Sequence, residues 1–518
     1  MAVGVTGLTV HTQNGSGTWK DYGTGGGSTS TTATFLSGTT SRGRKFTGSK
    51  GFAFEVNASG MSLSNTTILL RFLVNGGLAA TLAGGGGSIR LEDTSGNTSD
   101  WYIAGSDTYN GGWFEAVIDT ANAESANSGT AANLSLIQYV GILVNASSSS
   151  GGDPNVYVDE ILSWANTGLT VTGNTTNMFD ELATWDETSL YGIITRRGGV
   201  VFCKAPLVLS PDASNHASTD EVVVFEEPIY EDGTNVDSAV TIAGFGSGDA
   251  DTITFTRLVA ICEDNGDITG TNADKKMDFT SAGDIVADTS TFRGFNGTVM
   301  HLGGTGNSYD DCTFQGCSQI VDTGAVVRRG FVRDTAAAAA ESALLWTGSS
   351  DWEDTQFIMG STNSHAMEVE AAGTDAWNGF TFTGYNATAG PTSVGNEVLN
   401  NNSTGAVTVN ASNVTGTISF YNRGVGSSTT INNNVTGTFT PLIAGTEVRV
   451  YTAGTSTELD GVESSGTSFG ASIAGSTSVD YVIHHNEYEY IRVEGFTWPT
   501  SNQGIGVAQR PDRNYLNP

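Results

Sequence analysis

The sequence predicts an all-β protein whose central part is a stack of parallel β-coils, and two observations carry this prediction. Glycine, serine, threonine and asparagine are abundant, with 68 glycines, and only 15% of the residues are charged. A short Thr-Phe-x-Gly phrase recurs in the central part: Thr291-Phe292-Arg293-Gly294, Thr313-Phe314-Gln315-Gly316 and Thr381-Phe382-Thr383-Gly384. Looser copies at Phe331 and Phe357 give steps of 22, 17, 26 and 25 residues between the phenylalanines. Strand formers repeated near this period favour coils that stack and bury a phenylalanine ladder.

Residues 1–165 are predicted to form a jelly-roll β-sandwich of their own. Several stretches alternate apolar and polar side chains, as half-buried strands do: Phe52–Val56, Ile68–Val74, Trp113–Ile118 and Tyr139–Val144. Clusters of glycine, serine and asparagine separate these stretches, which is typical of antiparallel strands joined by turns.

The chain then continues with a connector, a parallel β-helix and a second sandwich. Residues 166–205 are predicted to hold one helix, Met178–Leu190, and the first strands of the coils. Residues 206–443 form the predicted right-handed parallel β-helix, in which Ala336–Leu345 is expected to be a helical insertion. Residues 444–518 are predicted to form a small C-terminal β-sandwich with an extended tail. Two alternating stretches support it: Thr446–Tyr451 and Tyr488–Val493.

The first sandwich contains motifs that carry a family resemblance. They are Trp101-Tyr102, Tyr109-Asn110-Gly111-Gly112-Trp113-Phe114 and Tyr157-Val158-Asp159-Glu160-Ile161. This segment, within the first 165 residues, resembles the jelly-roll modules of lectin-like and carbohydrate-binding domains. It also resembles segments near the front of large structural proteins in tailed phages of marine bacteria. The resemblance implies that Asp159 helps to bind a structural calcium ion.

Three aromatic residues of these motifs, Trp101, Tyr109 and Trp113, are candidates for glycan binding. Aromatic faces can stack on sugar rings, and exposed aromatic side chains often mark binding sites. The alternative is that the three side chains close the sandwich core, because large aromatic residues are usually well buried. The sequence leaves both interpretations open.

Charged residues recur at fixed distances before the repeated phenylalanines. At a distance of four residues before a phenylalanine stand Asp288, Asp310 and Glu353. At a distance of three residues stand Asp311, Arg328 and Asp354. If the coils are in register, these side chains stack about 4.8 Å apart on one face. We prefer a structural salt-bridge ladder, which is ordinary on repeat faces. A calcium site and a catalytic carboxylate pair for glycan cleavage, drawn from Asp310, Asp311, Glu353 and Asp354, are the alternatives.

Charge and cysteine content exclude several classes of function. The net charge of −32 disfavours nucleic acid and anionic membrane surfaces as partners. The chain has no apolar run long enough to insert in a membrane and no signal peptide at its start, so we expect synthesis in a host cytoplasm. Four dispersed cysteines without CxxC spacing indicate neither a disulfide framework nor a zinc site. We expect that the protein requires no cofactor, with a structural calcium ion as the one candidate.

The architecture and the resemblance together predict a structural protein on the virion surface of a tailed bacteriophage. It would be a tail fibre or tailspike, or a fibre attached to the capsid. The resemblance to proteins of this type implies that the chain forms a homotrimer, contacts other virion proteins and adheres to host-surface polysaccharide. We prefer a role without enzymatic activity and leave an enzymatic role open. One alternative is a tailspike depolymerase that cleaves host polysaccharide, and another is a purely architectural fibre without a receptor role.

Overall fold

The computed structural model describes most of the chain as β-strands, with a single helix in the described residues. The described residues are 3–12, 17–23, 29–31, 36, 40–44, 48–74, 82–103, 113–121, 124–146, 156–189, 191–209, 214–226, 241–245, 252–262, 276–281, 284–296, 300–335, 342–360, 365–386, 396–475, 477–499 and 502–512. The chain divides into two compact units, Met1–Val286 with Phe292–His301 and Ala287–Thr291 with Leu302–Pro518. The predicted fold class, an all-β protein with jelly-roll and parallel β-helix parts, is confirmed.

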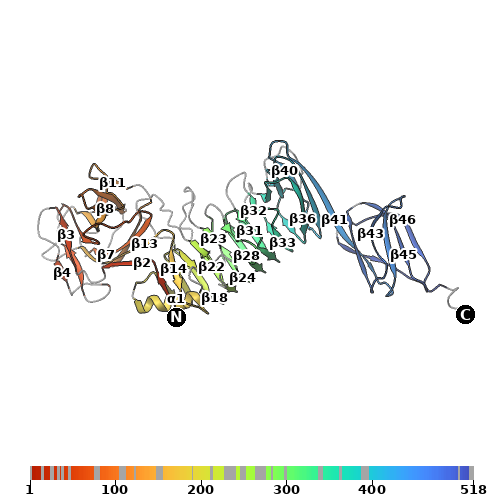
Figure 1. Cartoon of the computed structure of the whole chain (residues 1–518), viewed down its shortest axis with the longest axis horizontal. Coiled ribbons are helices and arrows are strands. Elements are labelled where there is room, and N and C mark those ends of the chain that lie inside the picture. The colour runs from red at the N-terminus through yellow and green to blue at the C-terminus, as the bar shows by residue number, and fades with distance from the viewer. Residues whose placement is uncertain are drawn as a thin grey trace. The chain divides into compact units, whose positions relative to one another are not determined.

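The first unit begins with a sandwich of two antiparallel sheets (Figure 1). One sheet has the order β10 (Trp113–Asp119), β7 (Thr66–Val74), β13 (Val156–Ala165), β5 (Ser41–Arg44) and β4 (Thr29–Thr31), with β2 (Leu8–Thr12) also paired to β13. The other has the order β11 (Ala126–Asn127), β9 (Thr98–Ile103), β8 (Leu82–Asp93), β12 (Ile137–Ala146), β6 (Gly48–Glu55) and β3 (Trp19–Tyr22). Alternate residues such as Ile68, Leu70 and Phe72 point into a shared apolar core, which makes the period-2 pattern of the sequence visible in space.

After the sandwich, the first unit winds into coils with three parallel ladders. The first ladder is β14 (Leu169–Thr172), β17 (Leu207–Leu209), β20 (Thr241–Phe245), β23 (Lys276–Ser281) and β26 (Met300–His301), with β1 (Gly4–Thr6) antiparallel on β14. The second is β16 (Val200–Cys203), β19 (Val222–Phe225) and β22 (Val259–Cys262), preceded by β15 (Ile194–Arg197) in a hairpin with β16. The third contains β18 (His216–Thr219) and β21 (Ile253–Thr256).

A helix covers the start of these coils. Helix α1 (Met178–Ser189) follows β14, and its apolar side, with Phe179 and Leu182, is fully buried. Glu221 accepts hydrogen bonds from the backbone N–H groups of Phe179 and Asp180, at 3.4 and 2.7 Å, which satisfies donors that a helix start leaves unpaired. The predicted helix at Met178–Leu190 is therefore confirmed through Ser189, since Leu190 lies outside the described residues.

The second unit repeats the three-ladder arrangement. Its β29 ladder is β29 (Ile320–Val321), β32 (Ser342–Trp346), β35 (His365–Val369), β38 (Leu399–Asn401) and β40 (Phe420–Asn422). Its β28 ladder is β28 (Thr313–Cys317), β31 (Phe331–Thr335), β34 (Gln356–Ile358) and β37 (Thr381–Thr383). Its β27 ladder is β27 (Ser308–Asp310), β30 (Val326–Arg328), β33 (Asp351–Glu353), β36 (Gly373–Asn378), β39 (Ala406–Ser412) and β41 (Ser428–Thr440). Strands β24 (Ile285–Asp288) and β25 (Thr291–Arg293) fall at the boundary between the units.

One residue per coil turns the chain from the β27 ladder into the β28 ladder, and we call it the corner residue. The corner residues with their φ angles are Asp311 (51°), Arg329 (53°), Asp354 (51°) and Gly379 (74°). The corner N–H donates to the next coil, for example from Asp311 to the Arg328 carbonyl at 3.0 Å. The hydrogen-bonded ladder therefore continues around the bend. Glycine adopts this left-handed conformation freely and aspartate tolerates it, whereas arginine rarely does.

The predicted phenylalanine ladder is confirmed within the second unit, with one exception. Phe314, Phe357 and Phe382 are buried, and the rings of the last two stack with centroids 5.6 Å apart. In the intervening coil, Val332 rather than Phe331 pairs with Phe314 and Phe357. The register of that coil therefore lies one residue from the position that the phenylalanine suggested.

The C-terminal sandwich shares a strand with the last coil. The first half of β41 pairs in parallel with β39, and its second half pairs with β44 (Phe469–Ala474) and β47 (Gln503–Gly506). The facing sheet has the order β43 (Glu458–Val462), β42 (Glu447–Thr452), β45 (Ser478–His484) and β46 (Ile491–Thr497). A core that contains Phe439, Tyr481 and Trp498 lies between the two sheets.

The expectation of a helix through Ala336–Leu345 is wrong at its C-terminal end. Ser342–Trp346 forms strand β32, in which Leu344 pairs with Met367 of the next coil and is fully buried. Burial against the stack outweighs the helix preference of this segment. Residues 336–341 lie outside the described residues. All four cysteines are free and buried, and the one helix in the described part of the chain is too short and polar to span a membrane.

Candidate functional site

The aromatic residues singled out in the first sandwich occupy different environments. Trp101 is 6% exposed and belongs to the apolar core. Trp113, at the start of β10, is partly buried, and Tyr109 lies outside the described residues. Tyr102, the neighbour of Trp101, is 41% exposed. The glycan-platform hypothesis therefore depends, among the described residues, mainly on Trp113.

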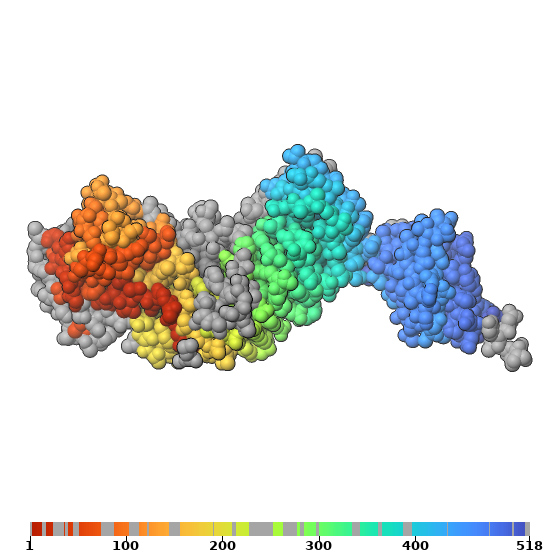
Figure 2. Space-filling view, in the orientation of Figure 1, coloured from red at the N-terminus to blue at the C-terminus, as the bar shows by residue number. Residues whose placement is uncertain are grey.

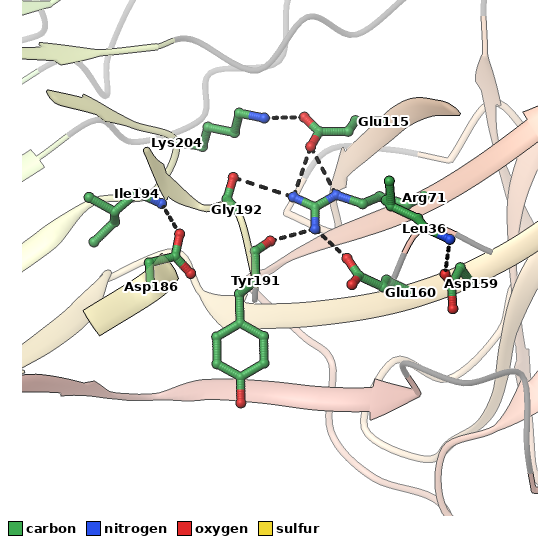
Figure 3. Close-up of polar contacts among 10 residues, drawn as sticks. All are labelled: Leu36, Arg71, Glu115, Asp159, Glu160, Asp186, Tyr191, Gly192, Ile194 and Lys204. Atoms are coloured by element: carbon green, nitrogen blue, oxygen red, sulfur yellow. Dashed lines mark hydrogen bonds and ion pairs between the residues drawn. The ribbon is translucent and has the colours of Figure 1, made fainter. Parts of the chain in front are cut away.

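Asp159, the candidate calcium ligand, is fully buried on β13. Its Oδ2 accepts a hydrogen bond from the backbone N–H of Leu36 at 2.5 Å (Figure 3). Among the residues that the structure describes, no group of three or more His, Cys, Asp or Glu side chains could hold a metal ion. Calcium binding by Asp159 stays a prediction of the resemblance.

The next residue of β13, Glu160, belongs to a charged network centred on Arg71 of β7 (Figure 3). Arg71 is 5% exposed and pairs with Glu160, which is fully buried, and with Glu115 of β10 at 2.9 Å. Lys204, just after β16, pairs with the other oxygen of Glu115. Burial raises the pKa of Glu115, but Lys204 and Arg71 outweigh that effect, and its pKa lies below the usual range.

The same guanidinium also binds the loop that follows α1. Arg71 donates to the carbonyls of Tyr191 and Gly192, the second at 3.3 Å. Gly192 has φ 65°, and a Cβ there would lie 3.0 Å from Arg71 Nη2, so this position suits glycine. Asp186 of α1 accepts a hydrogen bond from the Ile194 N–H at 2.6 Å. The network thus joins the sandwich, the helix and the first coil strands within the first unit.

The charged residues of the coils form two columns in the second unit. In the first column Asp310, Arg328, Glu353 and Asn378 are paired in register. The second column is the corner itself: Asp311, Arg329, Asp354 and Gly379. The expected position of Arg328 beside Asp311 and Asp354 is therefore wrong, and Arg329 lies there. The reason is that Val332, and not Phe331, pairs with Phe357. Each position of this coil is therefore filled by the residue one place later in the chain than the phenylalanine alignment predicted.

The arginines of these columns neutralise the carboxylates around them. Arg329 binds Asp311 through two hydrogen bonds of 2.9 Å and approaches Asp310 to 2.7 Å. Arg328 lies 2.8 Å from Asp351 and 3.4 Å from Glu353. The hydrogen bonds from Arg329 lower the pKa of Asp311. A general acid for glycan cleavage needs the opposite shift, because it must hold a proton near neutral pH.

A second buried carboxylate, Glu368 on β35, has polar neighbours on both of its oxygens. Asn402 donates to one of its oxygens at 2.9 Å and Gln319 to the other at 3.3 Å. Burial raises the pKa of Glu368, which is 5% exposed. Because both oxygens have protein partners, the observed contacts fit a structural role within the stack.

A groove of about 420 Å³ runs along the exposed side of α1. The surface around α1, yellow in the space-filling view, faces solvent (Figure 2). Polar residues at helical spacing line it: Asn177, Asp180, Glu181, Thr184 and Thr188. Val3, Trp185 and Arg196 complete the lining. Here an aromatic ring, hydroxyl groups and an ion pair share one open surface.

Sequence reasoning did not find this groove. Its residues come from the chain start, from α1 and from β15, and no repeated phrase connects them. The available signal was a tryptophan beside a stripe of short polar side chains on the helix predicted for the connector. That stripe is equally typical of a solvated helix face, so only the fold shows the open groove.

No protein-family model matches the chain, and no curated protein matches its sequence. Among solved structures, it is similar to a family 11 carbohydrate-binding module of the cellulosomal cellulase Lic26A-Cel5E of Clostridium thermocellum, with 14% identity, a TM-score of 0.22, and 31% of this chain and 95% of that chain covered. It is also similar to the catalytic domain of a GH87 α-1,3-glucanase in complex with tetrasaccharides, with 10% identity, a TM-score of 0.21, and 82% and 85% covered. These likenesses are too low to carry an argument about function.

Proposed function

We propose that this chain is a structural protein on the virion surface of a tailed bacteriophage and that it adheres to host-surface glycans. The observation that carries the proposal is the set of corner residues. Asp311 and Asp354 occupy left-handed positions that aspartate tolerates, and Arg329 pairs with Asp311. The corner carboxylates Asp311 and Asp354 therefore have a conformational role, and the coils serve as a support.

Several features support the rest of the proposal. The sequence of the first sandwich resembles phage structural proteins, and stacked coils suit a protein that must persist outside a cell. The net charge of −32 favours solubility and disfavours nucleic acid. A homotrimer and contacts with other virion proteins remain part of the proposal by resemblance.

The depolymerase alternative has less support from the coil columns. Its candidates are Asp310, Asp311, Glu353 and Asp354, and the pKa of Asp311 is shifted in the direction that opposes acid catalysis. If the alternative holds, the purified chain releases reducing ends from host polysaccharide and Asp310→Asn or Asp311→Asn abolishes the release. If these four carboxylates are structural, the purified chain should release no reducing ends from any host polysaccharide.

The virion part of the proposal is tested by immunogold electron microscopy of purified particles, with antibody raised against this chain. Gold at the tail or baseplate supports a fibre or spike that adheres to hosts, and gold over the head supports a capsid fibre. Unlabelled particles, with antibody that detects the protein in lysate, contradict the virion assignment. The adhesion part is tested separately, by binding of the purified chain to host cells and extracted host polysaccharide.

A further inference from the structure

We propose that the groove along α1 is a binding site for an uncharged saccharide. This inference rests on the glycan adhesion proposed above and gives it a place in the fold. The argument depends on three properties of the groove: an aromatic side chain in its wall, hydrogen-bonding groups along its rim, and charges that are already paired.

The aromatic side chain is Trp185, which is half-buried. Its ring packs against Tyr191 with centroids 5.8 Å apart. A Cβ on Gly4 would lie 3.3 Å from its Nε1, so the backbone of β1 closely approaches that edge of the indole. Contacts on two sides hold the ring in place, while Trp185 still lines the groove. An aromatic surface held in this way can receive the apolar face of a sugar ring with little loss of side-chain freedom.

The rim carries donors and acceptors suited to hydroxyl groups. Thr188 is exposed and donates to the Trp185 carbonyl at 2.7 Å, which leaves the acceptor capacity of its oxygen directed to the groove or to solvent. The exposed Asn177 side chain adds an amide donor and an acceptor. Sugar hydroxyls, which donate and accept, match such a mixed rim better than a purely apolar ligand does.

The charged residues of the groove are engaged by one another and by the backbone. Arg196 pairs with Asp180 at 3.2 Å and donates to the Asp180 carbonyl at 2.8 Å. Glu181 binds the N–H groups at the helix start, and those hydrogen bonds lower its pKa against the effect of burial. A charged ligand would have to break the Arg196–Asp180 pair or displace the hydrogen bonds that Glu181 accepts. This balance favours a neutral saccharide, and the volume of about 420 Å³ is in the range of small-ligand sites.

The test measures affinity of the full-length chain for defined neutral hexasaccharides, namely maltohexaose, cellohexaose, laminarihexaose and xylohexaose, by calorimetry and ligand-observed NMR. Trp185→Leu removes the aromatic face and Trp185→Phe keeps it. Thr188→Val removes one rim hydroxyl with little change of shape. Glu187→Gln is the matched control, because Glu187 is exposed on the same helix and does not line the groove. Trp113→Leu tests the competing aromatic platform of the sandwich. Circular dichroism and thermal unfolding confirm that each variant folds.

We expect wild-type binding to at least one probe, a loss on the order of tenfold in Trp185→Leu, and a smaller loss in Trp185→Phe. If Trp185→Leu does not fold, weaker binding by Trp185→Phe and Thr188→Val, with wild-type binding by Glu187→Gln, carries the same conclusion. Binding that only Trp113→Leu weakens overturns the groove assignment and leaves glycan adhesion intact. If the wild type binds host polysaccharide but none of the neutral probes, the neutral-saccharide inference is overturned while the proposed function stands. If it binds neither, the groove inference and the adhesion part of the proposed function both fall, while the virion part depends on the microscopy.

Discussion

Two arginine-centred clusters in this molecule have the same chemistry and opposite surroundings. Arg71 in the sandwich is 5% exposed and binds two carboxylates and two backbone carbonyls. The side chain of Arg329 at a coil corner is 54% exposed and binds Asp310 and Asp311. Water competes with each contact of Arg329, whereas Arg71 and Glu160 have given up hydration and depend on each other. The comparison teaches that recurrence of charge in sequence does not reveal where charge matters for stability.

The strongest way to break this comparison is to remove Arg71. Arg71→Leu leaves Glu160 buried without its cation, so we expect the first unit to lose about 3–5 kcal/mol of stability. Native-state hydrogen exchange of peptides that cover β7 and β13 measures the loss locally, which avoids treating this large chain as a two-state system.

The control for Arg71→Leu is the double variant Arg71→Leu with Glu160→Leu. Replacing both members of a buried pair with apolar residues removes the unpaired charge, and we expect it to recover part of the loss. If the single variant exchanges like the wild type, the network contributes little. The buried and exposed clusters would then be energetically equivalent, contrary to our interpretation.

The next prediction asks whether the corner depends on conformation. Gly379→Ala places a Cβ 1.9 Å from Asp354 Oδ1 and 2.9 Å from its Cα, at φ 74°. The left-handed backbone and the overlap together should cost about 2–4 kcal/mol, measured by exchange of β34 and β37. Gly373→Ala, at the start of strand β36 and with no atom within 4 Å of its Cβ, should be nearly neutral. Equal effects of the two variants would contradict a conformational requirement at the corner.

The sequence was sufficient for the periodic part of the fold and insufficient for its exact register. Phe314, Phe357 and Phe382 repeat visibly and do form a ladder, because each coil must bury one large residue at the same place. In one coil Val332 occupies the ladder position beside Phe314. From sequence alone, either Phe331 or Val332 could be the residue that points into the core. A shift of one residue moved the arginine column, since neighbouring strand residues face opposite sides.

The candidate sites were harder to predict, because they depend on what lies nearby in space. Aspartates before a phenylalanine could equally be catalytic groups or turn residues, and the φ of 51° at Asp311 shows that this aspartate is a turn residue. Trp101 belongs to an apolar core that many strands build together. Trp185 gains its significance from Gly4, which is distant in sequence, and from Tyr191, which lies just after the helix. Such juxtapositions leave no periodic trace in sequence.

A pH measurement sharpens the description of the buried cluster. The pKa of Glu115 is lowered in the folded protein, so its stabilising effect is present above its unfolded pKa of about 4.3 and is lost as pH falls through the lower folded value. We expect Glu115→Gln to cost about 1 kcal/mol at pH 7, after allowance for a side chain that is 33% exposed. The difference from wild type should shrink below about pH 4. A difference that stays constant from pH 7 to pH 3 would contradict the assigned ion pairs.

The smallest effect is expected at the exposed cluster, where backbone conformation and charge can be separated at one residue. Arg329→Gln removes the ion pairs with Asp310 and Asp311 and should cost less than about 1 kcal/mol, with the difference disappearing in high salt. Arg329→Gly also removes these ion pairs, but glycine adopts the left-handed backbone at φ 53° without strain. It should therefore be more stable than Arg329→Ala by about 1 kcal/mol. Hydrogen exchange of β30 and β31 ranks the three variants. If Arg329→Gln loses more stability than expected and Arg329→Gly is no more stable than Arg329→Ala, the charges rather than the turn explain the aspartates and the arginine at the corners.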